Sequence, residues 1–218
     1  MVIKERVILW DWNGTLLDDT KVCLTTMNSM LRKRNIPTIN LKRYKEVFSF
    51  PVVEYYQKIG FDFKIESFEN LSIEFINAYT SDLHSAPLVP HTEQVLKVFS
   101  RLGKENVIIS AMKQDRLTLS VMEKGLNEYF KDILGIRDIY AASKISLALE
   151  YVKNRGLNAS EIVLIGDTDH DFEVSSEIGC KCILIADGHQ SKERLRATGA
   201  YVILTLTELL PSILPKSL

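Results

Sequence analysis

The sequence has few cysteines, almost no net charge and no long apolar run. It contains three cysteines in 218 residues, an odd number without the CxxC pairs of redox or zinc sites. We expect Cys23, Cys180 and Cys182 to be reduced and buried, as free cysteines usually are. The formal net charge of −1 excludes the broad basic field that sequence-independent nucleic-acid binding requires, so no nucleic-acid partner is expected.

No stretch of the chain resembles a membrane span or a secretory signal. None approaches the roughly 20 consecutive apolar residues that cross a bilayer. Residues 1–10 lack the long apolar region and the small-residue cleavage site of a secretory signal. We therefore expect a cytoplasmic protein without a membrane partner, and the sequence leaves both a monomer and a homodimer open.

The chain has the composition of an ordinary globular protein, with 46% apolar and 25% charged residues. Short β-rich apolar runs alternate with helical spacing, and residues 95–102 and 145–152 each place apolar side chains at i, i+3, i+4 and i+7. This alternation predicts an α/β fold, a doubly wound parallel sheet covered on both faces. The expected strands lie at 7–10, 106–110, 138–142, 161–166, 181–186 and 200–204.

The region from 18 to 85 has a different pattern. Helical spacing recurs at 20–34, 51–59 and 65–82, with no buried strand among these stretches. The length of the chain exceeds the roughly 100–150 residues usual for one domain, which favours an insertion. We predict a helical cap over 18–85 and an α/β core formed by 1–17 and 86–218.

Six basic residues are clustered within the predicted cap. They favour either a solvated helix end and loop or a lid surface that attracts an anionic substrate. The six are Arg32, Lys33, Arg34, Lys42, Arg43 and Lys45.

Polar side chains follow the first predicted strand. It ends in Asp11, and ligands of open α/β sheets bind at the carboxyl ends of the strands, so Asp11 is a candidate site residue. Gly14 and Thr15 follow in a tight turn whose amides and hydroxyl suit phosphate oxygens.

Two later segments add further candidates for binding an anion. Ser110 ends the second predicted strand, and its hydroxyl together with the backbone N–H of Ala111 suits an anion at the same edge. Lys144 stands at a predicted helix start, where the macrodipole disfavours a cation unless an anion lies nearby. Taken singly, a helix cap at Ser110 and a solvated Lys144 are the ordinary interpretations.

An acidic motif follows the apolar strand at 161–166. Asp167, Asp169 and Asp171 alternate, and carboxylates this close repel one another unless a cation is present. Oxygen ligands of this kind suit Mg²⁺. Capping of a helix N-terminus explains Asp169 or Asp171, but it does not explain Asp167 directly after a strand and Gly166.

Together these motifs resemble the haloacid dehalogenase superfamily of aspartate-nucleophile phosphohydrolases. That pattern is a strand-end DxDGT, a strand-end Ser or Thr, a Lys and a GDxxxD-type motif. In this chain the matching residues follow in the same order, and the insertion resembles the C1 cap of phosphoglycolate phosphatase-like and β-phosphoglucomutase-like members. They are Asp11 to Thr15, Ser110, Lys144 and Gly166 to Asp171.

The resemblance implies a role for each matched residue. Asp11 would attack phosphorus and form an aspartyl-phosphate. Asp11, Asp167 and the backbone carbonyl of Asn13 would hold Mg²⁺. Ser110 and Lys144 would bind the transferring phosphoryl oxygens. Asp171 would either ligate the metal or orient Lys144.

The implied substrate is a small phosphorylated metabolite. It would be bound beneath a mobile lid with hinges near 16–20 and 83–90.

Asn13 departs from the family pattern, which places an Asp there as general acid and base. An amide does neither job at neutral pH, and its loss corresponds to about 10²–10⁴-fold in rate. Four explanations stay open: a substrate with a good leaving group such as an acyl phosphate, another acid such as Asp18 or Asp19, a catalytically weak or regulatory phosphate-binding protein, or an engineered change. None of the four histidines is assigned to the metal.

Overall fold

A six-stranded parallel sheet forms the centre of the molecule. The computed structural model describes residues 3–136 and 143–210. Within these ranges the strand order is β3-β2-β1-β4-β5-β6, so β1, whose residues are all buried, lies in the middle of the sheet. The strands are β1 (Val7–Trp10), β2 (Glu105–Lys113), β3 (Asp132–Ile136), β4 (Ile162–Gly166), β5 (Lys181–Ile185) and β6 (Tyr201–Ile203).

Helices cover both faces of the sheet because successive strand side chains point to opposite sides. Ile8 and Trp10 pack in one buried cluster with helices α5 and α6, whereas Val7 and Leu9 pack in a second cluster with α7, α8 and α9. This is the predicted doubly wound α/β fold. These helices are α5 (Thr92–Arg101), α6 (Gln114–Glu123), α7 (Lys144–Asn154), α8 (Asp169–Ile178) and α9 (Lys192–Ala197). Short 3₁₀ turns lie at Leu83–Ser85, Asn127–Tyr129, Ala159–Glu161 and Leu206–Leu209.

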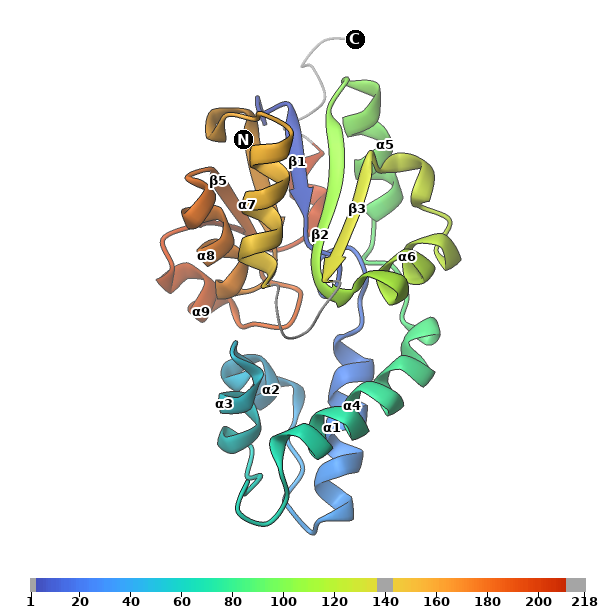
Figure 1. Ribbon diagram of the computed structural model, residues 1–218, viewed down its shortest axis with the longest axis vertical. Helices are drawn as coiled ribbons and strands as arrows, with labels where there is room; N and C mark the ends of the chain where they lie inside the picture. The colour runs from blue at the N-terminus through green and yellow to red at the C-terminus, as the bar shows by residue number, and fades with distance from the viewer. Residues whose placement is uncertain (1–2, 137–142, 211–218) are drawn as a thin grey trace.

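Four further helices lie beyond the carboxyl ends of the strands, in the lower half of Figure 1. They are α1 (Thr20–Lys33), α2 (Leu41–Val47), α3 (Val52–Lys58) and α4 (Phe68–Asp82). Three of them match the helices expected in the cap, and α2 was not predicted. Its seven residues contain three Lys and Arg, and the helix is fixed by Asn40, whose side chain accepts a hydrogen bond from the N–H of Arg43.

Strands β2 and β3 differ from the strands predicted in this part of the sequence. The expected strand at 138–142 lies outside the described residues, and β3 at Asp132–Ile136 was not predicted, since it begins with Asp and contains Gly135. Strand β2 is longer than expected and runs to Lys113, so Ser110 lies inside this strand and does not cap a helix. A register shift between Ile109 and Lys113 accompanies this extension.

The two connections between the sheet and α1–α4 lie side by side. Leu17 and Leu88 form an antiparallel bridge. The N–H of Asp18 donates to the carbonyl of Pro87 at 2.8 Å, and the N–H of Val89 donates to the carbonyl of Leu16 at 2.9 Å. The connection from β1 to α1 and the connection from α4 to α5 are therefore paired with each other.

The described residues contain no disulfide. All three cysteines are free, with Cys23 and Cys182 buried as expected, but the expectation of burial is wrong for Cys180, which is partly exposed. Over residues 3–136 and 143–210, no helix is both long and apolar enough to cross a membrane.

Candidate active site

The carboxyl ends of the central strands bring the candidate residues together. Trp10, the last residue of β1, is aligned with Ile108 of β2 and Ile165 of β4. The next residue, Asp11, is anchored by its N–H, which donates to the carbonyl of Ile165 at 2.9 Å. Ser110 lies two residues beyond Ile108, so one edge of the sheet presents both side chains.

Three buried carboxylates and one buried lysine form the centre of this edge. Oxygens of Asp11, Asp167 and Asp171 lie within 4.8 Å of one another. The ammonium of Lys144 donates to Asp11 and, at 2.5 Å, to Oδ1 of Asp171. Lys144 is 4% exposed and Asp171 is 1% exposed, so this ion pair is shielded from water.

The charges of this cluster are not balanced, because three carboxylates face a single ammonium group. Burial, together with the neighbouring Asp171 and Asp167, raises the pKa of Asp11 to about 8 despite Lys144. Burial likewise raises the pKa of Asp167 to about 6. Burial acts in the same direction on Asp171, but Lys144 and the hydrogen bonds to its carboxylate hold its pKa below the usual value. The cluster is therefore short of positive charge.

Asp171 is fixed by the start of α8. Its Oδ2 accepts hydrogen bonds from the N–H of Asp167 at 3.1 Å, the N–H of Thr168 at 3.0 Å and the Thr168 hydroxyl at 2.7 Å. A side chain at Gly166 would overlap the Asp171 carboxyl group, which explains the glycine at the end of β4. Asp169 points elsewhere and pairs with Arg194 at 2.6 Å.

Gly14 and Thr15 support Asp167. The Thr15 hydroxyl donates to Oδ1 of Asp167 at 3.0 Å, and Thr15 is completely buried. Gly14 has φ of +76°, and a side chain there would overlap the Asp167 carboxyl group. The Gly14 N–H donates to Oδ1 of Asp19 at 2.9 Å. Direct contact of these two residues with phosphate stays a prediction.

Asn13 belongs to a buried network around Asp19. Its amide nitrogen lies 3.1 Å from Oδ2 of Asp19 and 2.7 Å from the hydroxyl of Tyr79 in α4. The Tyr79 hydroxyl itself donates to Oδ2 of Asp19 at 2.6 Å. Asp19 is 1% exposed. The amide at position 13 therefore fits this place as a donor to Asp19, where a second ionised carboxylate would meet repulsion.

His189 connects the network to the acidic centre, although it belongs to none of the motifs recognised in the sequence. Its Nε2 lies 3.1 Å from Oδ1 of Asp19, its Nδ1 lies 2.8 Å from the Tyr44 hydroxyl, and its N–H donates to Asp167 at 2.6 Å. Burial opposes protonation, but Asp19 and Asp167 raise the pKa of His189 to about 9. The same pairing holds the pKa of Asp19 below its usual value against the effect of burial.

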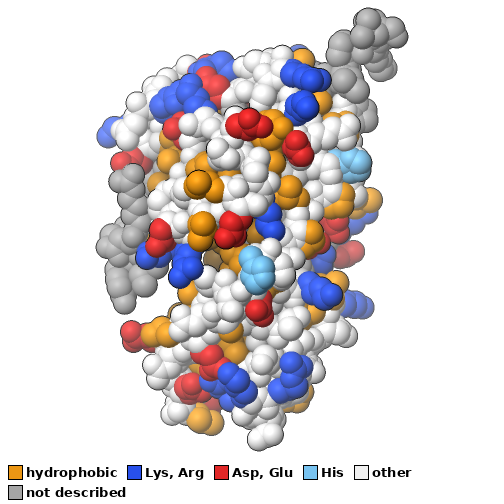
Figure 2. All heavy atoms as spheres, turned by 90° about the vertical axis from the view of Figure 1, so that its right-hand side faces the viewer, with side chains coloured by type: hydrophobic (Ala, Val, Ile, Leu, Met, Phe, Trp, Pro, Cys, Tyr) orange, Lys and Arg blue, Asp and Glu red, His pale blue; other side chains and the backbone are white. Residues whose placement is uncertain are grey.

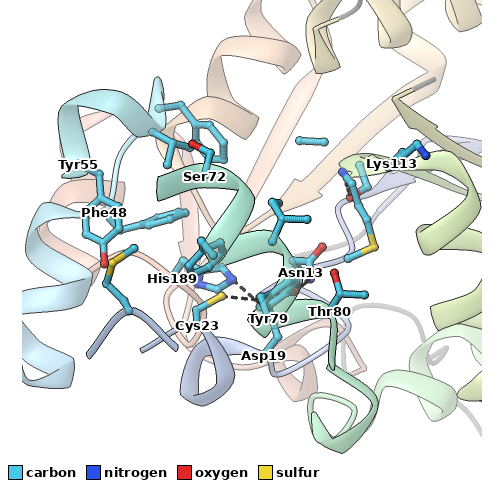
Figure 3. Close-up of a pocket in the computed structure, with 18 of the residues that line it drawn as sticks. Asn13, Asp19, Cys23, Phe48, Tyr55, Ser72, Tyr79, Thr80, Lys113 and His189 are labelled. Carbon is cyan, nitrogen blue, oxygen red and sulfur yellow. Dashed lines mark hydrogen bonds and ion pairs between the residues drawn. The ribbon is translucent and has the colours of Figure 1, made fainter. Parts of the chain in front are cut away.

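A cavity of about 990 Å³ opens between this edge and α1–α4. Six of the candidate residues line it, whereas Gly14, Thr15 and Asp167 lie behind its surface. The six are Asp11, Asn13, Ser110, Ala111, Lys144 and Asp171. Figure 3 shows Asn13, Asp19, Tyr79 and His189 grouped on one side of this cavity.

The parallel sheet, the carboxylate cluster at its edge and the adjoining cavity are those of an α/β enzyme. Comparison with known families gives the finer assignment, because residues 8–185 match the model described as haloacid dehalogenase-like hydrolase. The chain belongs to this family and is a hydrolase. The family resemblance predicted from the motifs is confirmed.

Individual relatives agree with this assignment. A phosphoglycolate phosphatase of Pseudomonas savastanoi pv. phaseolicola is 22% identical over 96% of this chain and 80% of its own length. A 5'-nucleotidase of Pseudomonas aeruginosa is 24% identical over 87% of this chain and 86% of its own length. A solved haloacid dehalogenase-like family protein from Streptococcus pneumoniae shares the fold, with a TM-score of 0.83, 17% identity, and coverage of 95% of this chain and 97% of that one.

Proposed function

We propose that this protein is a Mg²⁺-dependent phosphohydrolase that uses Asp11 as the nucleophile on a small phosphorylated metabolite. The observation that carries the proposal is the buried group of Asp11, Asp167 and Asp171 around Lys144 at the base of a large cavity. Relatives named phosphoglycolate phosphatase and 5'-nucleotidase both act on phosphate esters by name, which supports the reaction class.

The donor set fits magnesium. Carboxylate oxygens from Asp11 and Asp167 are hard ligands of the type that Mg²⁺ prefers, and the cluster lacks the positive charge that such an ion brings. The backbone carbonyl of Asn13 is the third expected ligand. Asp171 is either a fourth ligand or the group that orients Lys144. When bound, the ion shields the nucleophile from the anionic substrate.

The side chains at the cavity base divide the remaining work. Asp11 attacks phosphorus, the bond to the leaving oxygen breaks, and an aspartyl-phosphate forms on Asp11 before water releases phosphate. Lys144 and Ser110 donate to the phosphoryl oxygens, where negative charge is stabilised in the transition state. Lys144 is held for this task by Asp171 at 2.5 Å.

Asn13 leaves the leaving-group oxygen without the usual acid. Its amide nitrogen is hydrogen-bonded to Asp19 and Tyr79, and Asp19 itself accepts hydrogen bonds from several donors. We therefore expect the best substrates to carry leaving groups that depart with little help from a proton.

The cap is the second part of the proposal. We propose that residues 18–85 act as a lid over a core of 1–17 and 86–218, with hinges near 16–20 and 83–90. The paired segment at Leu17 and Leu88 supports this division, because both connections cross at one place.

Phosphate release in Mg²⁺ and in excess chelator tests the proposal. Native protein, Asp11→Ala and Asn13→Asp are each assayed on acetyl phosphate and on a panel of alkyl phosphomonoesters. We expect native protein to hydrolyse acetyl phosphate in a metal-dependent way and Asp11→Ala to be inactive. Equal activity of Asp11→Ala and native protein would contradict the nucleophile assignment.

Asn13 also favours a second candidate, a phosphometabolite-binding protein without turnover. This alternative predicts that native protein is inert on every compound and that Asn13→Asp gains an activity that a further Asp11→Ala change removes.

A further inference from the structure

The cap wall of the cavity is aromatic. Eight of the described residues that line the cavity are Phe or Tyr from the region 18–85: Tyr44, Phe48, Phe50, Tyr55, Tyr56, Phe68, Phe75 and Tyr79. Many of these rings support one another. Phe48 stacks on Tyr44 with centroids 5.3 Å apart, and Phe75 stacks on Tyr79 at 5.5 Å. The wall is thus held in place before any ligand binds.

Part of this apolar wall is left uncovered. Phe48, Phe50 and Phe75 are only partly buried. Ile73 and Ile76 of α4 also line the cavity, and they are 54% and 57% exposed. Apolar surface in contact with water is unfavourable, so a ligand that covers it gains binding free energy.

The charges on the cap wall oppose a carboxylate. Within the described part of the cap, no Lys, Arg or His side chain lines the cavity, and the charged lining residues are Asp19 and Glu69. The cluster of basic residues at 32–45 is used in part by ion pairs, since Lys33 and Arg34 bind Glu74. An anionic group on this side would meet an apolar and acidic surface.

Cations at the cavity come from the core. Lys144 is engaged by Asp11 and Asp171, while Lys113 and Arg116 lie exposed at the end of β2 and the start of α6. His189 also lines the cavity, with its ring centroid 5.1 Å from that of Phe48, and its charge is paired with Asp19 at 3.1 Å. Figure 3 shows Lys113 across the pocket from Phe48 and Tyr55. Lys113 therefore lies apart from Phe48 and Tyr55, whereas Arg116 lies near Thr80 and Leu83 at the C-terminal end of α4.

The size of the cavity also favours a larger ligand. A volume of about 990 Å³ lies at the upper end of the roughly 300–1,000 Å³ of small-molecule sites. A phosphate with a two-carbon acid fills a small part of it. We propose that the substrate is a phosphate monoester whose leaving group carries an uncharged aromatic ring, bound against Phe48, Phe75 and Ile76. This assignment rests on the proposed function, because it takes Asp11 as the phosphoryl end of the site.

Three phosphonates that resist hydrolysis test the ring site by titration calorimetry in Mg²⁺. They are 3-phenylpropylphosphonate, propylphosphonate and 3-phosphonopropionate, which share the phosphonate head and differ at the far end. We expect the phenyl compound to bind at least tenfold more tightly than the propyl compound, and the carboxylated one to bind most weakly. Equal affinity of phenyl and propyl compounds, tightest binding of the carboxylated one, or no binding of the phenyl compound overturns the proposal.

Variants on the exposed part of the wall locate the effect. Ile76→Arg places a cation beside the proposed ring site, so it should remove most of the phenyl preference and improve binding of 3-phosphonopropionate. Ile65→Arg is the matched control, because Ile65 is 85% exposed in the cap and does not line the cavity. A phenyl preference that survives Ile76→Arg and Phe75→Leu unchanged contradicts the assigned wall.

Hydrolysis of matched esters separates this proposal from the proposed function. The alcohols released from 2-phenylethyl phosphate and ethyl phosphate are similar in acidity, so the lack of a general acid at Asn13 slows both reactions alike. The ratio of their kcat/KM values therefore reports binding of the ring. If the phosphonates bind as expected but neither ester nor acetyl phosphate is hydrolysed, the phosphohydrolase proposal fails and the ring site stands. If both esters are hydrolysed at equal kcat/KM and the phosphonates bind alike, the ring site fails and the phosphohydrolase proposal stands.

Discussion

The two sides of the cavity differ in nearly every physical property. The sheet edge is crowded with buried charge, in which Asp11, Asp167 and Asp171 surround Lys144. The cap side is built from aromatic and aliphatic side chains, and Figure 2 shows hydrophobic side chains in the hollow between the upper and lower parts of the molecule. Charge at the edge suits phosphoryl chemistry, whereas the neutral wall suits recognition of the remainder of the substrate.

A polar contact network around Asp19 joins the two sides. Tyr79 of α4 donates to Asp19 at 2.6 Å and lies 2.7 Å from the amide of Asn13. His189 links Tyr44 of α2 to Asp19 and, through its backbone N–H, to Asp167. Asp19 therefore makes contacts with both the cap and the residues next to the reactive edge. Substitutions on the two sides should separate their contributions.

The largest expected effect is on the reactive edge. Asp11→Asn removes the nucleophile while keeping its size, so phosphate release should fall by roughly 10⁴-fold or more, a loss typical of a missing nucleophile. Asp62→Asn is the control, since Asp62 is exposed and its side chain accepts a local hydrogen bond from the N–H of Lys64. Substantial residual activity in Asp11→Asn would move the chemistry away from the sheet edge.

Lys144→Met tests the charge balance of the same edge. It leaves Asp11 and Asp171 buried without their cation, and breaking such a pair destabilises a protein by about 3–5 kcal/mol. Mg²⁺ should restore part of this loss, because it supplies positive charge to the same carboxylates. Chemical denaturation with and without Mg²⁺ measures both effects. A variant as stable as native protein without metal would show that the ion pair contributes little.

Asn13→Asp tests the boundary between the two sides. The new carboxyl group would lie beside Asp19 and would be favoured in its protonated form, as a general acid requires. We expect hydrolysis of alkyl phosphomonoesters to rise by about 10²-fold, and hydrolysis of acetyl phosphate to change little, since its leaving group needs no proton. The kcat/KM ratio of the two substrates is the measurement. An equal change for both would mean that position 13 does not act on the leaving group.

The smallest expected effect lies within the cap, far from the reactive edge. Hydrogen bonds from Arg34 hold the pKa of Glu66 and of Glu74 below their usual values. This stabilisation is fully present above about pH 4.3, the pKa of a glutamate in the unfolded chain. It disappears as the pH falls through the lower pKa values of Glu66 and Glu74 in the folded protein. Arg34→Met should therefore lower the free energy of unfolding by about 0.5–1 kcal/mol at pH 7, since the cluster is partly exposed, and by less at pH 3. Denaturant titrations at both pH values measure the difference, and a loss of equal size at pH 3 would assign it to packing.

The reactive edge could be predicted from the sequence, but the network beside it could not. Asp11 and Asp167 follow buried strands directly, and parallel strands bring their carboxyl ends to one edge. Tyr79 and His189 lie 60 and 170 residues from Asp19 and belong to no motif, so only the fold shows that they meet. Asn13 was recognised as a departure, but its hydrogen bond to Asp19 was not foreseen.

The sequence of the cap is enriched in aromatic residues. Ten of the 17 Phe and Tyr residues of the chain lie between 18 and 85, which is more than the length of that region explains. Helical spacing predicted three of the four helices of the cap. It did not predict α2, because Leu41–Val47 is short and rich in Lys and Arg. Which rings face the cavity depends on tertiary packing, which spacing alone does not determine.

Trapping the covalent intermediate tests the central claim most directly. Native protein is mixed with acetyl phosphate and Mg²⁺, quenched, and treated with borohydride, which reduces an aspartyl-phosphate to homoserine. Peptide mass spectrometry then locates the reduced residue. The proposal predicts homoserine at position 11 of the native protein. It predicts no homoserine in the double variant that carries both Asp11→Ala and Asn13→Asp. Turnover of acetyl phosphate with reduction at another position, or with no reduced residue, would contradict it.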